Sequence, residues 1–466
     1  MAESVVDWIE QHSLKFTDLA RRIWGTPELG LHEHESSAAL AEVLEADGFH
    51  VERGVAGMPT AFTASFGHGA PVIALLGEYD ALPGLSQAGG VAEPRPLAPG
   101  GPGHGCGHNL LGTAAAAAAL AVAGAIRRGE LGGTVRFYGC PAEETLVGKV
   151  FMVREGLFDD VDCALTWHPG SQNAIWAASS QALNSARFRF YGRAAHAAAN
   201  PEEGRSALDA VELMDVGANF LREHVPQSAR IHYVISSGGE APNVVPAFAE
   251  VWYYVRAPRR DEVEEIYHRL LDIAQGAALM AGVRHDVDLV TGCHDTLPNQ
   301  ALGDLLHAKM LEIGAPRFSA GEHDLARALQ GTFPEGLVGR AVREARRKGL
   351  DLPDDCRLVE TVAPIVGYGE SEGGSTDVGD VSKVVPTAQI TTVTAPLGTP
   401  GHSWQNVVAA GSAIGERGML FAAKVLASST AALLGNPELV ALAKEEFERT
   451  RGDYVSPVQG LAVPLG

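Results

Sequence analysis

Apolar positions alternate along the N-terminal half of the chain between a helical period and short runs typical of strands. Apolar side chains at helical spacing predict an amphipathic helix over residues 3–24. The segments that follow predict, in order, a helix at 36–47, strands at 60–66 and 72–76, a helix at 111–127, and strands at 133–140 and 161–166. Strand–loop–helix alternation of this kind predicts an α/β domain with a largely parallel sheet flanked by helices.

The pattern changes over residues 183–296, which predict a separate α+β unit. The expected elements are strand 185–191, helix 204–223, strands 231–236 and 249–256, helix 260–281 and strand 284–290. This βαββαβ order is compact enough to form an inserted domain. The α/β pattern then resumes with helix 299–313, strand 390–395 and helix 409–426, and the residues after Thr450 are expected to form a surface tail. We therefore predict one domain from residues 1–182 and 297–466, and an inserted domain from 183–296.

Composition narrows the class of protein. The chain has 466 residues, of which 46% are hydrophobic and 20% charged, an ordinary globular balance for two or three domains. Its formal net charge of −21 argues against nucleic acid as a partner, because phosphate would be repelled.

Nothing in the sequence suggests export or a membrane span. Five irregularly spaced cysteines do not form a disulfide framework. The N-terminus lacks a basic stretch followed by an apolar run, and the alanine-rich run at 114–125 is shorter than the ~20 residues that span a bilayer. We expect a cytoplasmic enzyme without a membrane segment.

Potential metal ligands follow the predicted strands. Cys106 and His108 share the glycine-rich run GHGCGHN, Glu143 and Glu144 follow a strand in PAEE, and His168 and His402 stand in WHPG and GTPGHSW. Adjacent buried carboxylates need a cation or a shared proton, so one could bind metal while the other serves as a base. Thiolate, imidazole and carboxylate together suit Zn²⁺, with Mn²⁺, Co²⁺ or Ni²⁺ as alternatives.

Each of these signals has an ordinary reading as well. A histidine beside glycine is often a solvated turn residue, and a glutamate pair often begins a helix. Cys106 could be a small buried apolar residue or a nucleophile that makes the protein a metal-free cysteine hydrolase. A phosphate-binding loop at GPGHGCGHN lacks the Gly-Lys-Ser/Thr ending that such a loop needs. Spacing alone leaves the metal centre and the cysteine nucleophile both open.

The ordered set of motifs resembles the M20 metallopeptidases and amidohydrolases. The motifs are GEYDALPGL, GHGCGHN, PAEE, WHPG, GRAAHAA, APNVVP, YYVRAP, STDVGD and GTPGHSW, and they span Pro27 to about Val425. The resemblance is nearest to the branch typified by aminobenzoyl-glutamate hydrolase B-subunits. It implies a catalytic domain with an inserted lid or dimerisation domain, two divalent metal ions (Zn²⁺ or Mn²⁺, with Co²⁺ or Ni²⁺ possible) and a homodimer formed through the lid.

By resemblance, the metal ligands are Cys106, His108, Glu144, His168 and His402, with the Cys106 thiolate between the two ions. Glu143 matches the general base. Asp80 matches the acidic residue of a His-x-Asp motif, as a ligand or as a group that orients a neighbouring imidazole. The histidine of that motif is replaced by Glu78, so the roles of Glu78 and Asp80 stay open.

The resemblance also assigns roles in the lid. His196 matches a histidine that reaches the active site of the partner subunit and stabilises the oxyanion, and Asn243 and Arg256 match residues that hold the substrate carboxylate. From the residues alone, Arg256 could instead pair with Asp261 or Glu250, and His196 could be a surface turn residue.

The resemblance implies a metal-dependent amidohydrolase that cleaves N-acyl or N-aroyl amino acids, such as p-aminobenzoyl-glutamate, or dipeptides. The expected partner is therefore a small amide that carries a carboxylate. Two alternatives remain: a catalytically silent homologue that serves as a binding or regulatory subunit of a hetero-oligomer, and the cysteine hydrolase based on Cys106.

Overall fold

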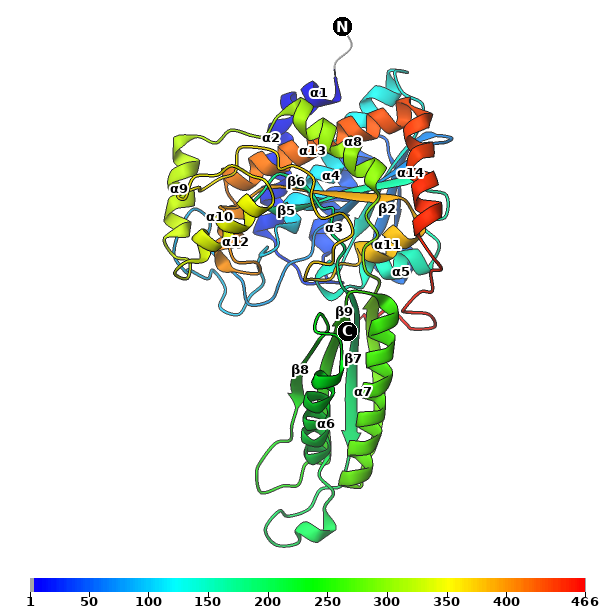
Figure 1. The fold of residues 1–466 in the computed structure, drawn as a ribbon, viewed down its shortest axis with the longest axis vertical. Helices are drawn as coiled ribbons and strands as arrows, with labels where there is room; N and C mark the ends of the chain where they lie inside the picture. The colour runs from blue at the N-terminus through cyan, green and yellow to red at the C-terminus, as the bar shows by residue number, and fades with distance from the viewer. Residues whose placement is uncertain (1–3, 466) are drawn as a thin grey trace.

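The computed structural model describes residues 4–465 and contains two bodies, each built on its own sheet. The larger body is a seven-stranded sheet between helices, and the smaller one extends from it as a four-stranded sheet with two helices (Figure 1). The predicted α/β class and the added α+β unit are confirmed. The exact boundaries at 182/183 and 296/297 stay a prediction; β7 begins at Ala182 and β10 ends at Cys293.

The large sheet has the strand order β1-β2-β4-β3-β5-β11-β6. Its four central strands, β4, β3, β5 and β11, are mutually parallel, as expected from the alternation of strands and helices. The outer strands β1, β2 and β6 pair antiparallel, so the sheet is mixed at both edges. The strands are β1 His50–Arg53, β2 Phe62–His68, β3 Val72–Glu78, β4 Gly133–Cys140, β5 Cys163–Gly170, β6 Ala174–Ile175 and β11 Thr387–Val393.

Two apolar helices, α4 (His108–Arg127) and α13 (Ala413–Gly435), pack together in the core of this body. Both are long and apolar enough to cross a membrane by length and composition alone. However, 94% of the apolar window of α4 and 67% of that of α13 are buried inside the protein. Their apolar character is therefore explained by burial against the sheet and by the close approach that alanine side chains permit.

The remaining helices of the large body surround the sheet. The sequence pattern did not predict α5, α9, α10, α11 or α14; two of them, α5 and α11, have seven residues each and give little periodic signal. The helices are α3 His34–Glu45, α5 Gly148–Arg154, α8 Gln300–Ile313, α9 Ala320–Gln330, α10 Leu337–Arg347, α11 Val378–Val384, α12 Trp404–Ala410 and α14 Pro437–Thr450.

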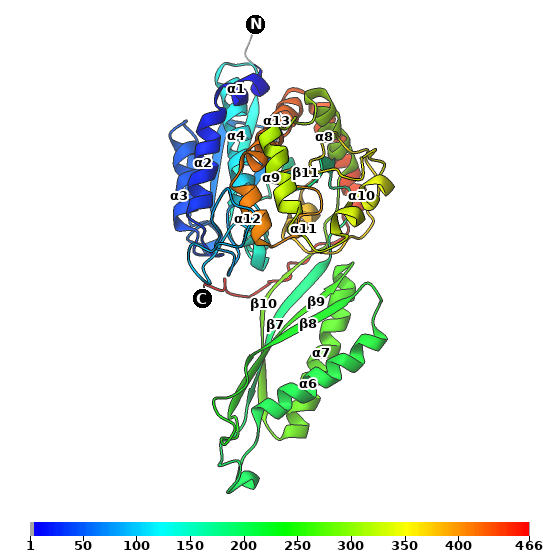
Figure 2. The same ribbon diagram turned by 90° about the vertical axis from the view of Figure 1, so that its left-hand side faces the viewer.

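The smaller body, here called the lid, follows the predicted βαββαβ order. Its sheet is antiparallel throughout, in the order β10-β7-β9-β8, and both helices cover the same face (Figure 2). The elements are β7 Ala182–Tyr191, α6 Ala207–Leu221, β8 Arg230–Ser237, β9 Phe248–Ala257, α7 Arg260–Ala281 and β10 Arg284–Cys293.

Two single helices predicted from sequence are each divided in the structure. The helix predicted over 3–24, whose first residue lies outside the described range, is α1 (Val5–Gln11) followed by α2 (Ser13–Gly25). The chain bends at His12, whose Nδ1 lies 2.8 Å from the Trp8 carbonyl oxygen. Likewise, the helix predicted over 409–426 is interrupted between α12 and α13, where the Ser412 hydroxyl accepts from a backbone amide and starts a new helix.

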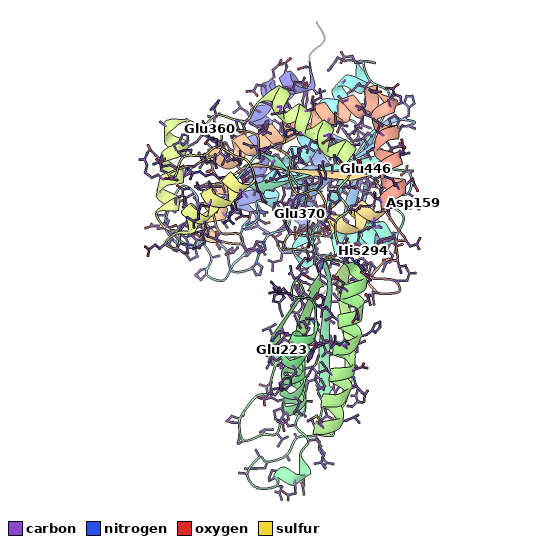
Figure 3. All side chains as sticks on the ribbon, viewed as in Figure 1. Asp159, Glu223, His294, Glu360, Glu370 and Glu446 are labelled. Atoms are coloured by element: carbon purple, nitrogen blue, oxygen red, sulfur yellow. The ribbon has the colours of Figure 1, made fainter. Side chains whose placement is uncertain are left out.

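The residues after Thr450 form no helix or strand, as expected of a surface tail, and about half of those described are exposed, but the segment is anchored to the rest of the molecule. Val458 is fully buried, and the Tyr454 hydroxyl donates to Asp380 at 2.9 Å. The His294 Nε2 lies 2.9 Å from the Val455 carbonyl oxygen, and His294 stands where the lid joins the large body (Figure 3). The last residues therefore pack at this junction, because a few apolar side chains in an otherwise irregular segment are enough to bury it.

Candidate metal centre and active site

The four parallel strands bring their carboxyl ends to one edge of the sheet, where ligands collect in α/β folds. The predicted ligands, the predicted base Glu143, and Glu78 and Asp80 all lie at or just beyond this edge. Glu78 ends β3, with Asp80 two residues later; Glu143 and Glu144 follow β4; His168 is near the end of β5; His402 follows β11; and Cys106 and His108 stand at the start of α4. The topology thus gathers residues that are far apart in sequence.

A cavity of about 260 Å³ opens at this edge. Six predicted site residues line it: Cys106, Glu143, Glu144, His168, His402 and Arg256. His108 is fully buried immediately behind the lining, with its Nε2 3.8 Å from Glu143 Oε2. The cavity therefore has ligand candidates on one side and a guanidinium on another.

Two groups of three side chains each bring their ligand atoms within 4.8 Å of one another, and they share one residue. The first consists of Cys106, His108 and His168, and the second of Cys106, Glu144 and His402. The distance from Cys106 Sγ to His168 Nε2 is 3.3 Å, and that from His402 Nε2 to Glu144 Oε2 is 3.4 Å. Ligands bound at about 2.0–2.3 Å to one ion, at angles of about 90–110°, lie roughly 3.0–3.6 Å apart. Each of these two distances therefore fits a pair of ligands bound to one ion.

Several buried polar atoms at the site have no hydrogen-bond partner within the described part of the chain. They are His108 Nε2, Glu78 Oε2 and Glu144 Oε1. An unsatisfied buried polar atom costs about 1–3 kcal/mol, and more when it is charged. A cation would offset this cost for all three, so the residues present fit a metal centre.

Hydrogen bonds fix which nitrogen of each imidazole is free. His168 Nδ1 lies 2.7 Å from the Pro169 carbonyl oxygen and so must donate to it, which leaves Nε2 as a lone-pair donor toward Cys106. His108 Nδ1 donates to Asp80 Oδ1 at 2.8 Å, which turns its Nε2 toward the other ligand candidates. Against the effect of burial, Cys106 and Asp80 hold the pKa of His108 well above its usual range, so Nε2 must lose a proton before it can bind a cation. Asp80 Oδ2 accepts from the Glu144 amide at 2.9 Å, so one carboxylate orients two ligand candidates.

Without a cation, the cluster retains protons that ligands must lose. Burial, aided by the negative charge of Glu144, raises the pKa of the Cys106 thiol to about 12. Burial raises the pKa of Glu144 to about 7, and burial together with Glu78 and Asp377 raises that of Glu143 well above its usual range. Burial lowers the pKa of His168 to about 4, so its imidazole is neutral. A thiol with so high a pKa is a poor nucleophile, which weighs against the cysteine hydrolase.

Local backbone conformation places the glutamate pair and the Cys-Gly-His segment. Glu143 and Glu144 form a short 3₁₀ turn between Ala142 (φ 54°) and Leu146 (φ 58°), both in the left-handed region. The Ala142 amide donates to Glu33 Oε1 at 2.8 Å, and this bond secures the start of the turn. Gly107 has φ 82° and precedes α4, a conformation that glycine adopts without penalty. Nothing in the local sequence around Glu33 indicated this contact.

Sequence reasoning also missed a buried ion-pair network beside His108. Lys149 is fully buried, and its Nζ lies 2.7 Å from Glu78 Oε1 and 2.6 Å from Asp377 Oδ1. Asp377 Oδ2 also accepts from the Lys149 backbone amide at 2.8 Å. Asp377 lies in the STDVGD motif, to which the sequence analysis gave no role. The available signal was a lysine within the largely apolar run of α5.

Arg256 projects from β9 into the cavity without a carboxylate partner among the described residues. Its Nη1 donates to Ser375 Oγ at 3.4 Å, and its buried Nε has no acceptor. The alternative partners named from sequence are engaged elsewhere: Glu250 pairs with Arg189 at 2.8 Å, and Asp261 pairs with Arg259. The guanidinium is therefore available for an anionic ligand.

His196 and Asn243 do not join this cavity. Both are exposed, His196 in the loop after β7 and Asn243 in the loop between β8 and β9. These loops lie at the end of the lid farthest from the large body (Figure 1). The ten residues of β7 separate these loops from the junction, a span of roughly 33 Å. The two loops contact each other, since the Ala197 amide donates to the Asn243 carbonyl at 3.0 Å.

Comparison with known proteins agrees with this architecture. Residues 178–279 match the family model described as a peptidase dimerisation domain. The chain is 45% identical to the p-aminobenzoyl-glutamate hydrolase B-subunit of Escherichia coli over 95% of this chain and 94% of that protein. It is 28% identical to the Xaa-Arg dipeptidase of Mus musculus, over 94% of this chain and 90% of that protein.

Solved structures share the fold at low sequence identity. An aminobenzoyl-glutamate utilization protein from Klebsiella pneumoniae superposes with a TM-score of 0.60 at 17% identity, covering 91% of this chain and 97% of that one. A dinuclear metal-binding peptidase of the M20 family from Bacillus subtilis gives a TM-score of 0.52 at 15% identity, over 91% of this chain and 99% of that one.

Proposed function

Because this chain belongs to the M20 family of hydrolases, we propose that it cleaves the amide bond of N-acyl or N-aroyl amino acids with two divalent metal ions. The observation that carries this proposal is the pair of ligand groups sharing Cys106, set in a cavity that Glu143 and Arg256 also line. The leading substrates are p-aminobenzoyl-glutamate-like amides, supported by the 45% identical relative of that name. Dipeptides are the second choice within the same reaction class, in keeping with the more distant dipeptidase.

In this proposal, Cys106, His108 and His168 hold one ion, and Cys106, Glu144 and His402 hold the other. Bound metals supply an acidified water and polarise the carbonyl. Glu143 lies beside these ligands, and its raised pKa suits a group that accepts a proton from the nucleophile and returns it to the departing amine. Asp80 holds the His108 ring and the Glu144 backbone in place.

The oxyanion is stabilised by His196 of a second copy of the chain. The His196 Nδ1 accepts from the Ala198 and Ala199 amides at 3.2 Å each, so a neutral ring carries its proton on Nε2. That proton has no fixed acceptor in the loop and can be donated to a developing negative oxygen. Since a strand roughly 33 Å long separates this loop from the cavity of its own chain, the cavity of a second copy is the more accessible target.

Arg256 and Asn243 are proposed to bind the carboxylate of the substrate. A planar guanidinium can pair with a carboxylate through two parallel hydrogen bonds. Arg256 lines the cavity of its own chain, and Asn243 accompanies His196 at the far end of the lid. A carboxylate anchored at Arg256 would place the amide nearer the metal ligands.

The acyl or aroyl group of the substrate is proposed to lie near Trp176, where a second cavity adjoins the catalytic one. This side chain lines the catalytic cavity and also a second cavity of about 520 Å³. Its ring meets His168 edge to face, with centroids 5.7 Å apart. An aromatic wall next to a metal ligand favours flat aroyl groups, because ring–ring contacts add to the area they bury.

A homodimer through the lid is proposed as the working assembly. Strand β8 is the edge of the lid sheet and exposes Tyr233, Val234 and Ile235, while α6 exposes Val216 and Phe220. Unpaired edge strands and clustered exposed apolar side chains mark association surfaces. The match of residues 178–279 to a peptidase dimerisation domain supports association through the lid.

Zn²⁺ or Mn²⁺ is proposed as the native metal, because thiolate, imidazole and carboxylate ligands are present together. The cytoplasm is proposed as the compartment. All five cysteines are free thiols, which suits a reducing environment.

Metal content and hydrolysis, measured before and after chelation, test the function directly. About two ions per chain, with activity on an N-aroyl amino acid panel lost on chelation and restored by Zn²⁺ or Mn²⁺, would support it. Activity that survives chelation but is lost in Cys106→Ser would favour the cysteine hydrolase. Metal binding without hydrolysis by this chain alone would favour a regulatory role in a hetero-oligomer, an option in keeping with a relative that is itself named as one part of a hydrolase.

A further inference from the structure

We propose that Glu78 supplies an additional carboxylate ligand to the metal ion held at His108, and that Lys149 is the positioning residue that presents it. The inference rests on the proposed metal centre, and it gives a role to the residue that replaces a histidine in the motif GEYDALPGL. Glu78, His108 and Glu143 form a third group whose ligand atoms lie within 4.8 Å of one another, and it shares only His108 with the group of Cys106 and His168, so the Glu78 side chain would have to shift toward that ion to bind it.

Two unsatisfied atoms of Glu78 and His108 lie next to each other. Glu78 Oε2 and His108 Nε2 are 3.3 Å apart, yet neither has a hydrogen-bond partner in the described chain. The two atoms are at ion-pair distance when His108 is protonated, but their contact lacks hydrogen-bond geometry, although both are buried. Two ligands of one ion are expected about 3.0–3.5 Å apart when each lies about 2.0–2.1 Å from the metal. The spacing is that of two ligand atoms directed at one shared metal ion.

Lys149 determines which oxygen of Glu78 is available. Its ammonium binds Glu78 Oε1 at 2.7 Å and so leaves Oε2 as the oxygen that faces His108. Asp377 holds the ammonium from the other side at 2.6 Å and also accepts from the Lys149 amide. A buried ammonium is costly unless it is paired, so this fully buried lysine is confined to the position between the two carboxylates.

Glu78 and Asp80 flank the same imidazole. They are two residues apart at the end of β3, a spacing that puts side chains on one face of an extended chain. Asp80 accepts a hydrogen bond from His108 Nδ1, while Glu78 Oε2 lies beside Nε2. The end of β3 therefore both orients the His108 ring and places a carboxylate oxygen beside its Nε2.

Metal affinity, measured by calorimetric titration of the chelated protein with Zn²⁺, tests this assignment independently of activity. Wild type should take up two ions. In Glu78→Gln, one of the two ions should bind about 100-fold more weakly or be lost, and Lys149→Met should weaken the same ion by about 10–100-fold. Asp380→Asn is the matched control, since Asp380 is also a fully buried carboxylate of the large body but bonds to Tyr454 and the His294 amide. It should bind both ions as wild type does.

Thermal unfolding of each metal-free variant separates lost ligation from lost folding. If Glu78→Gln does not fold, the triple variant Glu78→Leu/Lys149→Met/Asp377→Asn removes all three charges of the network together, which a buried site tolerates better than a single unpaired charge. A folded variant without Glu78 that binds both ions within about threefold of wild type would overturn the inference, leaving Glu78 as a counter-charge for Lys149. Wild-type protein that takes up no metal would instead overturn the proposed function.

Discussion

The ligand cluster of the large body and the His196 loop of the lid differ in what surrounds them. At the cluster, His108, Lys149 and Asp377 are fully buried, and each is held by charged partners of the same chain. At the far end of the lid, His196 and Asn243 are exposed, and the contacts that hold them come from neighbouring loop backbone. Both regions carry residues that the same reaction would need.

This difference indicates which parts of the site one chain can preorganise. Buried charges are stable only when their partners are fixed, so the metal centre is specified within a single fold. The exposed His196 imidazole, in contrast, can act on the reaction only once it is bound in the cavity of a second copy of the chain. The following experiments test that division, beginning with the one expected to change activity most.

Replacement of the proposed base should separate metal binding from catalysis. We expect Glu143→Ala to lower kcat by about 10³–10⁴-fold, because proton transfer to and from the reacting groups is lost. Metal content, measured by elemental analysis, should stay near the wild-type value since Glu144 is the ligand. Loss of both ions from this variant would show that base and ligand had been confused.

Replacement of the lid histidine tests whether the exposed loop serves a second copy of the chain. We expect His196→Ala to lower kcat by about 10²–10³-fold through loss of an oxyanion donor. When it is mixed and refolded with Glu143→Ala, about a quarter of all sites in random dimers should have both groups intact, and activity should return to that level. A mixture as inactive as its components would mean that His196 acts within its own chain, and an unchanged kcat of His196→Ala alone would mean that it has no catalytic part.

Arg256 lies between the two regions, at the lid end nearest the cavity. Arg256→Ala should raise KM for substrates with a free carboxylate by about 10–100-fold, the effect of removing a charged hydrogen-bonding partner, with a smaller change in kcat. Matched carboxamide substrates provide the control and should be little affected. Equal losses on both series would contradict a role in carboxylate recognition.

The pH dependence of metal binding should reveal the protons that the buried cluster holds. Burial raises the pKa of Cys106 to about 12 and that of Glu144 to about 7 in the metal-free protein. Against the effect of burial, Cys106 and Asp80 hold the pKa of His108 well above its usual range. Protonated ligands must release their protons to bind, so affinity should rise with pH: by at least about tenfold per unit between pH 7 and 9, from the thiol and the His108 ring, and more steeply below pH 7, where Glu144 is also protonated. Calorimetry in buffers of different ionisation enthalpy measures this release. An affinity independent of pH would contradict the proposed ligands.

The sequence by itself determined the parts that depend on local pattern and ordered motifs. Periodicity predicted the α/β body and the βαββαβ order of the lid, and α7 begins and ends where the pattern indicated. The ordered motifs named Cys106, His168 and His402 as ligand candidates, although more than 200 residues separate the last two in the chain. Such motifs are readable because strand ends need particular residue types in a fixed order.

Tertiary structure alone decided the contacts made by isolated residues. In the sequence Lys149 is a single charge in an apolar run with no predicted element, and only the meeting of β3, α5 and α11 brings it between Glu78 and Asp377. The burial of Val458 in a segment expected to be a surface tail has the same origin. Pairings across hundreds of residues leave no periodic trace in a single sequence, because they depend on where the sheet places each element.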